Sequence, residues 1–440
     1  MIALTAPEIA ALCGGRTSAE ATVIGVSIDS RAVSAGDLFV ALPGARTDGT
    51  RFAADALRAG AAAVLVAGTP GDPPPDGDSI VVPDPLIALG QIAAEVRRRS
   101  GARVVGVTGS TGKTSTKDIL GAMLRRLLRT VASHANFNTE IGLPLTLCRI
   151  EADTEAVVCE LAMRGMGQIA YLAEIARPDV AVITSVGAVH LELVGTVEAV
   201  AEAKAEILQP LGPGGTAVVP HAEPLLEPYV QMTRARVITF GEEADADVRL
   251  AGMTAGRAEI ALRGRRFMVP VNFDQHHNGL NLAAAVAACV GLGLDPEDDG
   301  LWAGAGEVEF SRWRGERLEM AGGGFVIADC YNANPVSMGA ALRHLVEAAD
   351  GRRTVAVLGE MAELGPAGPG LHAEVGREAE RLGVDIVMAV GPLSRDYGGR
   401  WFADPAAVVA GLADVLRPGD AVLVKASRSA GLETVVEALQ

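Results

Sequence analysis

Lysine is scarce in this sequence. Four of its 440 residues are lysine, so 34 of the 38 basic residues are arginine, and 54 acidic residues bring the formal net charge to −16 at pH 7. Nucleic-acid-binding proteins usually carry a basic surface. We therefore expect no nucleic-acid partner. The preference for arginine also raises the question of what the four lysines do, which are Lys113, Lys117, Lys204 and Lys425.

Long apolar runs and paired cysteines are also missing. The longest uncharged apolar run, residues 280–294, is shorter than the ~20 residues that a membrane-spanning helix needs. The first residues lack a basic segment and reach Glu8 early, unlike a signal peptide. The five cysteines are odd in number and do not follow the spacing of a zinc or CxxC motif. Free thiols in a reducing compartment are the simplest interpretation, so we expect a cytoplasmic protein without a membrane span.

Hydrophobic residues are plentiful, at 49% of the chain, while charged residues make up 21%. This balance is typical of a folded protein with large cores and excludes a disordered chain. At about 150 residues per domain, the length predicts three domains. We place them at residues 1–84, 85–310 and 311–440.

Apolar strands alternate with helices along most of the chain, which predicts an α/β fold with a parallel central sheet. The last domain repeats this alternation in a Rossmann-like manner, and the first domain is a small α/β unit. We expect strands at residues 24–28, 38–42, 64–66, 80–82, 104–107, 157–161, 180–184, 325–328, 354–358, 386–390 and 421–424. We expect helices at residues 50–59, 85–99, 114–129, 168–176, 197–208 and 280–292. Residues 69–78 read as a loop, and residues 217–271 as an antiparallel extension of the central sheet.

The sharpest motif is GVTGSTGKT at residues 106–114. It follows an apolar strand and opens a helix, which is the context that a phosphate-binding loop requires. Glycines let backbone N–H groups turn toward an anion, and the helix N-terminus adds its dipole. Lys113 would reach the β- and γ-phosphates, and the Thr114 hydroxyl would ligate Mg²⁺. Val107 stands where the common G-x4-G-K-[ST] pattern has glycine, so the loop is a variant of that pattern.

Read as TGSTGKT from residue 108, this loop resembles the ATP-binding loop of the Mur ligase superfamily. Further segments are similar to motifs of that family in the expected order. In the central domain they are NFNTEIG at 136–142, ELAMRG at 160–165 and HNGLNLA at 277–283. Other segments resemble the branch of the family that adds D-alanyl-D-alanine, and they are DSR at 29–31, GDLFVALPG at 36–44, DCYNANP at 329–335, LGEMAELG at 358–365 and LVKASR at 423–428.

The resemblance implies an ATP-dependent amide ligase of peptidoglycan precursor synthesis. ATP would phosphorylate a peptide carboxylate, and the amine of D-alanyl-D-alanine would attack the resulting acyl phosphate. The substrates would be UDP-N-acetylmuramoyl-tripeptide and D-alanyl-D-alanine, the cofactors ATP and Mg²⁺, and the active unit a monomer. The first domain would bind the UDP end, the central domain ATP and the third domain the amine, so the domains would have to close for reaction.

The resemblance also implies a metal site built on four residues. Thr114 and Glu160, which ends an apolar strand, would hold the first Mg²⁺. His190 would help to hold a second Mg²⁺ that the substrate carboxylate shares. Lys204 would be carbamylated by CO₂, which requires a neutral amine and turns it into an anionic oxygen ligand. Plain electrostatic positioning is the alternative role for Lys204, and a structural role the alternative for His190.

Other site residues follow from the same resemblance. The catalytic set is Lys113, Lys204 and His190. Those expected to bind ATP are Gly109, Ser110, Thr111, Gly112, Lys113, Thr114, Ser115, Asn281, Arg312 and Asp329. Those expected to bind the two substrates are Ser30, Arg31, Asn138, Thr139, Tyr331, Asn332 and Asn334. Lys425 and Arg428 are candidates for phosphate contacts, and Lys117 reads as a solvated charge near the site.

Two alternatives remain open. Another amide ligase of the same superfamily, such as a diaminopimelate- or lysine-adding enzyme or folylpolyglutamate synthase, would share the central motifs but not the DCYNANP segment. A nucleotide-dependent regulatory protein with a degenerate site would not need Lys113, Thr114, Glu160, His190 and Lys204 together.

Overall fold

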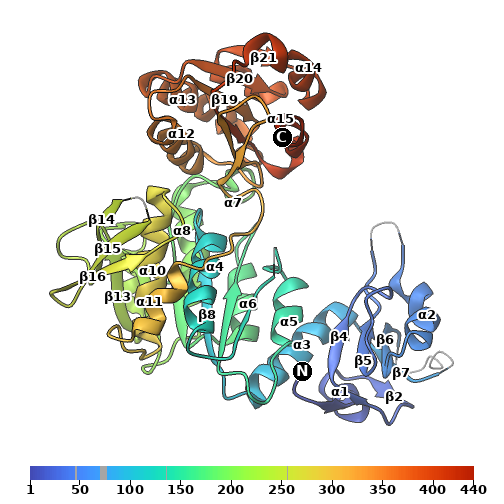
Figure 1. Cartoon of the computed structure of the whole chain (residues 1–440). Helices are drawn as coiled ribbons and strands as arrows, with labels where there is room; N and C mark the ends of the chain where they lie inside the picture. The colour runs from blue at the N-terminus through green and yellow to red at the C-terminus, as the bar shows by residue number, and fades with distance from the viewer. Residues whose placement is uncertain (45–46, 70–76, 135, 255) are drawn as a thin grey trace.

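The computed structural model of the chain describes residues 1–44, 47–69, 77–134, 136–254 and 256–440. Most of the loop predicted at residues 69–78 therefore lies outside the described residues. Within them, the strands form three large sheets, one in each of three domains that follow one another along the chain (Figure 1). The N-terminal and C-terminal domains lie on different sides of the central domain. The α/β fold with three domains is confirmed.

The N-terminal domain has a five-stranded sheet in the order β2-β7-β6-β5-β4 and a small β1-β3 sheet. Strands β4 to β7 are parallel, while β2 is antiparallel to β7. Its elements are β1 (Leu4–Thr5), α1 (Ala6–Leu12), β2 (Arg16–Thr17), β3 (Thr22–Val23), β4 (Gly25–Ser27), β5 (Asp37–Val40), η1 (Gly49–Phe52), α2 (Ala53–Arg58), β6 (Ala63–Ala67) and β7 (Ser79–Val82).

Helix α3 (Pro85–Arg99) joins this domain to the next. Asp84 caps it by accepting hydrogen bonds from the backbone N–H of Leu86 and Ile87, and Pro85 occupies the first turn, where its missing N–H costs nothing. Buried residues of α3, such as Ile92 and Val96, share one core with apolar residues of both neighbouring domains. The helix therefore fixes the first domain against the second.

The central domain has a nine-stranded sheet in the order β16-β15-β14-β13-β12-β11-β8-β10-β9. Strands β8 to β14 are parallel, and only β15 and β16 run antiparallel to their neighbours. Its strands are β8 (Arg103–Thr108), β9 (Thr130–Ala132), β10 (Ala156–Glu160), β11 (Val180–Ile183), β12 (Thr216–Pro220), β13 (Arg236–Gly241), β14 (Val248–Thr254), β15 (Arg257–Leu262) and β16 (Arg265–Pro270). Its helices after α3 are α4 (Lys113–Arg125), α5 (Gly142–Leu147), α6 (Gln168–Ala176), α7 (Leu191–Val194), α8 (Val197–Ala205), η2 (Glu206–Leu208), α9 (Glu227–Met232), α10 (His276–Gly291) and α11 (Asp299–Ala305).

The C-terminal domain has a six-stranded sheet in the order β17-β18-β22-β19-β20-β21, parallel except for β17. Helices on both faces give it a Rossmann-like architecture. Its elements are β17 (Glu316–Glu319), β18 (Phe325–Asp329), α12 (Pro335–Ala349), β19 (Thr354–Gly359), η3 (Gly365–Ala367), α13 (Gly368–Arg381), β20 (Ile386–Val390), η4 (Pro392–Tyr397), β21 (Arg400–Phe402), α14 (Pro405–Val415), β22 (Ala421–Lys425), η5 (Arg428–Ala430) and α15 (Glu433–Leu439).

Several predicted elements need correction. The antiparallel extension expected at residues 217–271 is wrong for its first half, because β12 and β13 continue the parallel sheet. The helix expected at 114–129 ends at Arg125, and the chain turns before β9. The helix expected at 280–292 begins four residues earlier, at His276, because its first turn is buried at Asn278 and Gly279, and Gly279 packs against Leu250 and Met253 of β14. Of the described helices, none combines the length and apolar character that crossing a membrane requires.

Candidate active site

The predicted phosphate loop lies where three neighbouring parallel strands end. Strands β11, β8 and β10 are adjacent in the sheet, and ligands of open α/β sheets gather at the carboxyl ends of such strands. Gly109 and Gly112 have φ angles of 147° and 79°. A Cβ at Gly109 would stand 1.9 Å from Thr184 Oγ1, and one at Gly112 would stand 2.3 Å from Asn281 Oδ1. Only glycine fits at positions 109 and 112. The close packing of the loop against Thr184 and Asn281 therefore requires these two glycines.

The end of β11 holds this loop from the other side. The backbone N–H of Ser110 donates to the Ser185 carbonyl at 2.9 Å, and that of Thr111 donates to Ser185 Oγ at 2.8 Å. The Thr184 hydroxyl donates to the carbonyls of Thr108 and Thr111. Ser115 follows in the first turn of α4 and is half-buried. The loop is therefore preorganised by hydrogen bonds inside the protein.

Lys113 is the first residue of α4, and its side chain folds back over the loop. Its Nζ donates to the Gly109 carbonyl at 2.6 Å and lies 3.5 Å from the Ser110 carbonyl. Burial lowers the pKa of Lys113, Glu160 opposes that shift, and Arg314 adds to it. The ammonium is therefore held against the carbonyls of the loop, and its contact with phosphates stays a prediction.

Glu160 and Thr114, the predicted ligands of the first metal, lie together. The Thr114 hydroxyl donates to Glu160 Oε2 at 2.9 Å, and Asn138 Nδ2 donates to Glu160 Oε1 at 2.9 Å. Thr114 and Glu160 are both buried. Within the described ranges, no three His, Cys, Asp or Glu side chains form a metal-ligand cluster. A carboxylate and a hydroxyl suit Mg²⁺, which commonly keeps waters and takes phosphate oxygens as further ligands.

His190 and Lys204 are within electrostatic reach of Lys113. Burial lowers the pKa of His190, and the positive charges of Lys113 and Lys204 lower it further, against the opposing effect of Glu363. A lowered pKa keeps the imidazole neutral at pH 7, which is the form that binds a metal. The charges of Lys113, His190 and Lys204 thus influence one another, and their catalytic roles stay predictions.

Lys204 lies on α8 with only 2% of its surface exposed. Burial, and then the charge of Lys113, lower its pKa well below the usual value. No ion pair found within the described part of the chain involves Lys204. A buried lysine without an acidic partner favours the neutral amine.

Asn281 packs beneath the phosphate loop. Its Oδ1 accepts a hydrogen bond from the Thr116 hydroxyl at 3.3 Å, and its Nδ2 donates to Asn278 Oδ1 at 3.1 Å. Asn278 in turn donates to Gln275 Oε1 at 3.1 Å. Asn281 therefore contacts the loop itself, and the adenine contact that its motif implies stays a prediction.

The linker to the third domain carries two arginines. Arg312, the predicted ATP contact, is exposed and stacks on Trp313 at 4.6 Å. Arg314 stacks over Tyr331 at 4.2 Å, and its buried Nε has no hydrogen-bond partner among the described residues. Arg314 is also the arginine that lowers the pKa of Lys113. Sequence reasoning missed Arg314, although it stands two residues after Arg312 in the same segment.

Lys425, which is buried, pairs with the half-buried Asp329 in the third domain. Lys425 Nζ donates to Asp329 Oδ2 at 2.7 Å and to the Asn332 carbonyl at 2.9 Å. Asn332 Oδ1 accepts from the backbone N–H of Ala333 at 2.9 Å. Lys425 is 1% exposed. Its role in this structure is to hold the segment at residues 329–335, and a phosphate contact stays a prediction.

Asn334 is a helix cap. Its Oδ1 accepts from the backbone N–H of Ser337 at 2.9 Å, and the Ser337 hydroxyl lies 3.1 Å from the Asn334 N–H, which closes a capping box on α12. We expect Asn334→Ala to destabilise the third domain by about 1 kcal/mol, seen as a lower unfolding midpoint in urea. Asn334→Asp, which retains a good cap, should keep the wild-type midpoint. An unchanged midpoint in Asn334→Ala would contradict this role.

The remaining predicted residues lie away from the loop or at its edge. Arg31 is bound bidentately to Asp29, with N···O distances of 2.9 and 2.7 Å, and its side chain is 88% exposed. These hydrogen bonds lower the pKa of Asp29 to about 2. Ser30 lies between them, in the N-terminal domain. Thr139 is exposed near the start of α5, and Arg428 is 3.4 Å from Glu433 Oε1.

Lys117 contradicts the prediction of a solvated charge. It is 3% exposed, its Nζ donates to the Ser133 carbonyl at 3.0 Å, and it lies 2.5 Å from Asp118 Oδ1. Asp118 Oδ2 in turn accepts hydrogen bonds from the backbone and hydroxyl of Ser311, at the start of the linker. The physical reason is that α4 packs inward, so this face of its second turn is covered. Lys117 thus connects the loop helix to the linker.

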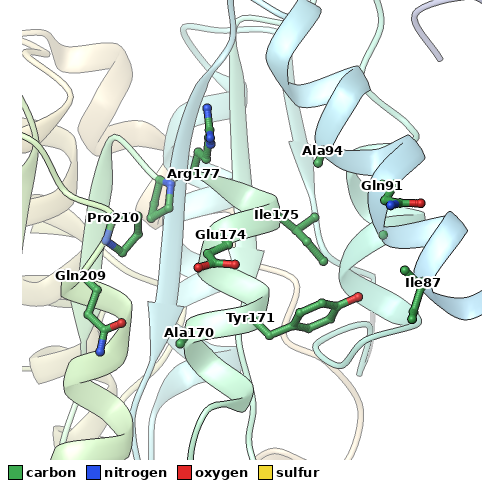
Figure 2. A pocket seen from close by; sticks show the side chains of 12 residues that line it. Ile87, Gln91, Ala94, Ala170, Tyr171, Glu174, Ile175, Arg177, Gln209 and Pro210 are labelled. Atoms are coloured by element: carbon green, nitrogen blue, oxygen red, sulfur yellow. The ribbon is translucent and has the colours of Figure 1, made fainter. Parts of the chain in front are cut away.

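A separate hollow of about 900 Å³ lies between α3, α6 and the turn at Gln209 and Pro210 (Figure 2). The Tyr171 ring extends from α6 toward Ile87 on α3, and Glu174 lies between the walls. None of the predicted site residues lines this hollow. It is therefore distinct from the phosphate loop site.

A parallel-sheet ATP-binding domain between a small α/β domain and a Rossmann-like domain defines the class of three-domain, ATP-dependent ligases. The chain belongs to the Mur ligase family. Three descriptions within the family match successive parts of it: "Mur ligase family, catalytic domain" at residues 22–97, "Mur ligase middle domain" at 107–289 and "Mur ligase, glutamate ligase domain" at 313–428.

Relatives of full length share a more particular name. The chain is 37% identical to the UDP-N-acetylmuramoyl-tripeptide–D-alanyl-D-alanine ligase of Synechocystis, over 94% of this chain and 91% of the relative. It is 36% identical to the ligase of that name from Mycobacterium tuberculosis, over 100% and 98%. Among solved structures, MurF from Acinetobacter baumannii matches with a TM-score of 0.90 and 28% identity, over 99% and 98%. MurF from Thermotoga maritima in complex with ADP matches with a TM-score of 0.83 and 31% identity, over 94% and 96%.

Proposed function

We propose that the chain joins D-alanyl-D-alanine to UDP-N-acetylmuramoyl-tripeptide at the expense of ATP, in the synthesis of peptidoglycan precursors. The observation that carries the proposal is the phosphate loop, where Lys113 and the hydrogen-bonded Thr114–Glu160 pair lie at the ends of the adjacent strands β8 and β10. The half-buried His190 and the buried Lys204 lie on the segments that follow the neighbouring strand β11. The names of the full-length relatives support the identity of the two substrates.

The reaction brings two anions together, the peptide carboxylate and the γ-phosphate. A carboxylate oxygen forms a bond to the γ-phosphorus, the bond to the β,γ-bridging oxygen breaks, and ADP leaves. The amine of D-alanyl-D-alanine then attacks the carbonyl carbon of the acyl phosphate. Phosphate leaves with the C–O electrons, the amine loses a proton, and an amide remains. The protein has to concentrate positive charge where the anions meet, although its net charge is −16.

In this proposal, Lys113 gives up its hydrogen bonds to the loop carbonyls when ATP binds and donates to the β- and γ-phosphates instead. Gly109 and Gly112, with Ser115 at the start of α4, would offer backbone N–H groups to the phosphates, while Ser110 and Thr111 line the loop with their N–H groups bound to Ser185. Thr114 and Glu160 are the residues that would hold Mg²⁺, and Asn138 orients Glu160 through its 2.9 Å hydrogen bond. When bound, Mg²⁺ would neutralise charge on the phosphate oxygens. Arg314, whose charge already lowers the pKa of Lys113, would add positive charge from the linker.

Lys204 is proposed to react with CO₂. The neutral Nζ forms a bond to the carbon of CO₂ and releases one proton, and the product is a carbamate anion with two oxygens. Together with neutral His190 it would hold a second Mg²⁺ beside the substrate carboxylate. The buried, unpaired amine is the condition that this chemistry needs.

The other domains supply the substrate ends. We propose that Ser30 and Arg31 bind the uridine diphosphate end, where a guanidinium suits a diphosphate bidentately. Asp329 and Arg312 would contact the nucleotide. The two substrates would be contacted by Tyr331, Asn332, Asn334 and Thr139. All these residues come from one chain, so we expect the monomer to be the active unit.

Phosphate release tests this function. With ATP, Mg²⁺ and UDP-N-acetylmuramoyl-tripeptide, the protein should release phosphate only when D-alanyl-D-alanine is added, and a UDP-linked pentapeptide should accumulate. The matched control replaces tripeptide and dipeptide with UDP-N-acetylmuramoyl-dipeptide and either diaminopimelate or lysine. Phosphate release with that pair, and none with D-alanyl-D-alanine, would instead identify another member of the family.

A further inference from the structure

His190 is contacted by the third domain. Its Nδ1 forms a short hydrogen bond with Oε2 of Glu363, which lies in the loop between β19 and η3. The same loop touches the segment after His190 a second time, because the backbone N–H of Glu192 donates to the Glu363 carbonyl at 3.2 Å. Gly365 packs there as well, since a Cβ at that position would come 3.2 Å from Glu192 Cα. Glu363 is therefore seated on the central domain by both its side chain and its backbone.

Both partners of this contact have unfavourable backbone conformations. His190 has φ 53° and Glu363 has φ 62°, in the left-handed region that side chains other than glycine rarely adopt. This conformation is unfavourable for most L-amino acids because it brings Cβ close to the following carbonyl oxygen. Glycine would relieve the cost at either position, so the conformation indicates that the side chains themselves are needed. Strained residues of this kind concentrate at functional sites.

The hydrogen bond decides which imidazole nitrogen is free. A carboxylate on Nδ1 holds a proton there, so Nε2 keeps its lone pair. Histidines that bind metals commonly donate their other ring N–H to a carboxylate, which fixes both the tautomer and the ring orientation. Arg164, whose Nε lies 3.8 Å from the other oxygen of Glu363, helps to hold that carboxylate in place.

We propose that Glu363 is a positioning residue that orients His190 from the third domain, so that the second metal site is complete only while that domain is docked. The inference rests on the proposed role of His190 as a metal ligand. Its consequence is an order of events: the domain proposed to carry the amine must arrive before the substrate carboxylate is fully coordinated. Acyl phosphate would then form only where the amine is at hand and water is excluded.

The alternative is that Glu363 only tethers the two domains. A second contact between the same domains provides the comparison. His344 Nε2 on α12 lies 3.7 Å from Asp274 Oδ1, in the segment just before α10. Asp274→Asn weakens that contact and leaves the surroundings of His190 unchanged. It is therefore the matched control for the effect of weakening any contact between the two domains.

The test counts bound Mn²⁺ by electron paramagnetic resonance, with a non-hydrolysable ATP analogue and UDP-N-acetylmuramoyl-tripeptide present. Wild-type protein should bind two ions. Glu363→Ala should weaken the second ion about 10–100-fold and leave the first, at Thr114 and Glu160, unchanged. Glu363→Gln, whose amide oxygen can still accept from Nδ1–H, should fall between the two. Asp274→Asn should bind both ions like the wild type.

The outcomes distinguish failure of this inference from failure of the proposed function. If His190→Ala keeps the second Mn²⁺, the proposed metal role of His190 is wrong. If His190→Ala loses that ion while Glu363→Ala and Glu363→Gln both keep it, the function stands and the positioning role is overturned. Equal weakening by Asp274→Asn and Glu363→Ala would overturn it too, in favour of a tether. Retention of the first ion shows that a variant is folded. If Glu363→Ala is not folded, the result for Glu363→Gln decides the test.

Discussion

Lys113→Ala is expected to lower kcat by about 10²–10³-fold, the usual effect of removing one preorganised electrostatic group from an active site. The ammonium is already directed into the loop, 2.6 Å from the Gly109 carbonyl. Without it, the charge that develops on the γ-phosphate during transfer loses its nearest compensating group. The effect should appear in kcat because the backbone N–H groups of the loop still bind the nucleotide. Phosphate release at saturating ATP and both substrates measures it.

Lys113→Arg should not restore the rate. The guanidinium is planar and larger than an ammonium, and the loop leaves little space, since even a Cβ at Gly112 would meet Asn281 at 2.3 Å. Arg126→Ala is the matched control, because it removes an exposed cation from the end of the same helix, where Arg126 Nη1 is 3.5 Å from Glu307 Oε2. That variant should keep the wild-type kcat. A Lys113→Arg variant with full activity would show that charge alone, and not the compact ammonium, is required.

Local signals were sufficient for the elements and residues that the sequence predicted well. Helix α3 begins and ends as predicted because Asp84 and Pro85 mark its start and apolar spacing its length. The contact between Thr114 and Glu160, beside Lys113, could be predicted because each of the three stands at a strand or helix end in a continuous motif. In a parallel sheet, such ends meet at one edge whatever the rest of the fold does.

The misses depend on contacts between distant parts of the chain. The first turn of α10 was overlooked because His276 to Gly279 are not apolar, yet Asn278 and Gly279 are buried by the packing of that turn. Lys117 looks exposed in sequence, and its burial arises from Ser133 and the fold of α4. Glu363 is 173 residues from His190, and nothing local to either residue indicates their contact.

The same limit applies to residues that a motif identifies without assigning a role. Asn334 and Lys425 belong to segments that resemble family motifs, but the hydrogen bonds show one capping α12 and the other holding Asp329. Arg314 shows the reverse, since no motif pointed to it, yet its charge lowers the pKa of Lys113. Sequence similarity therefore predicts where the site lies, while the contacts of individual residues required the three-dimensional structure.

Lys204→Ala is expected to lose about as much activity as Lys113→Ala, roughly 10²–10³-fold, and to regain part of it with added formate or acetate. The proposed carbamate is a small carboxylate-like anion, and the space left by the truncated side chain should admit a free one. Lys204→Arg should be inactive and should not respond, because a guanidinium fills the space and cannot form the carbamate. Phosphate release with increasing formate measures the rescue, and Lys113→Ala, which should show none, is the control.

The carbamate itself can be observed directly. The pKa of Lys204 is lowered by burial and by Lys113, so at neutral or mildly alkaline pH a larger fraction of this amine is uncharged than in the unfolded chain, and only the uncharged form takes up CO₂. Protein equilibrated with ¹³C-labelled bicarbonate should therefore show a carbamate carbon resonance that Lys204→Ala abolishes. Lys425→Ala should keep it, because Lys425 is equally buried but engaged by Asp329 Oδ2 at 2.7 Å and by the Asn332 carbonyl. Full activity in Lys204→Arg, or a resonance that survives Lys204→Ala, would leave Lys204 as a positioning charge, and the second metal would then need a ligand other than this lysine.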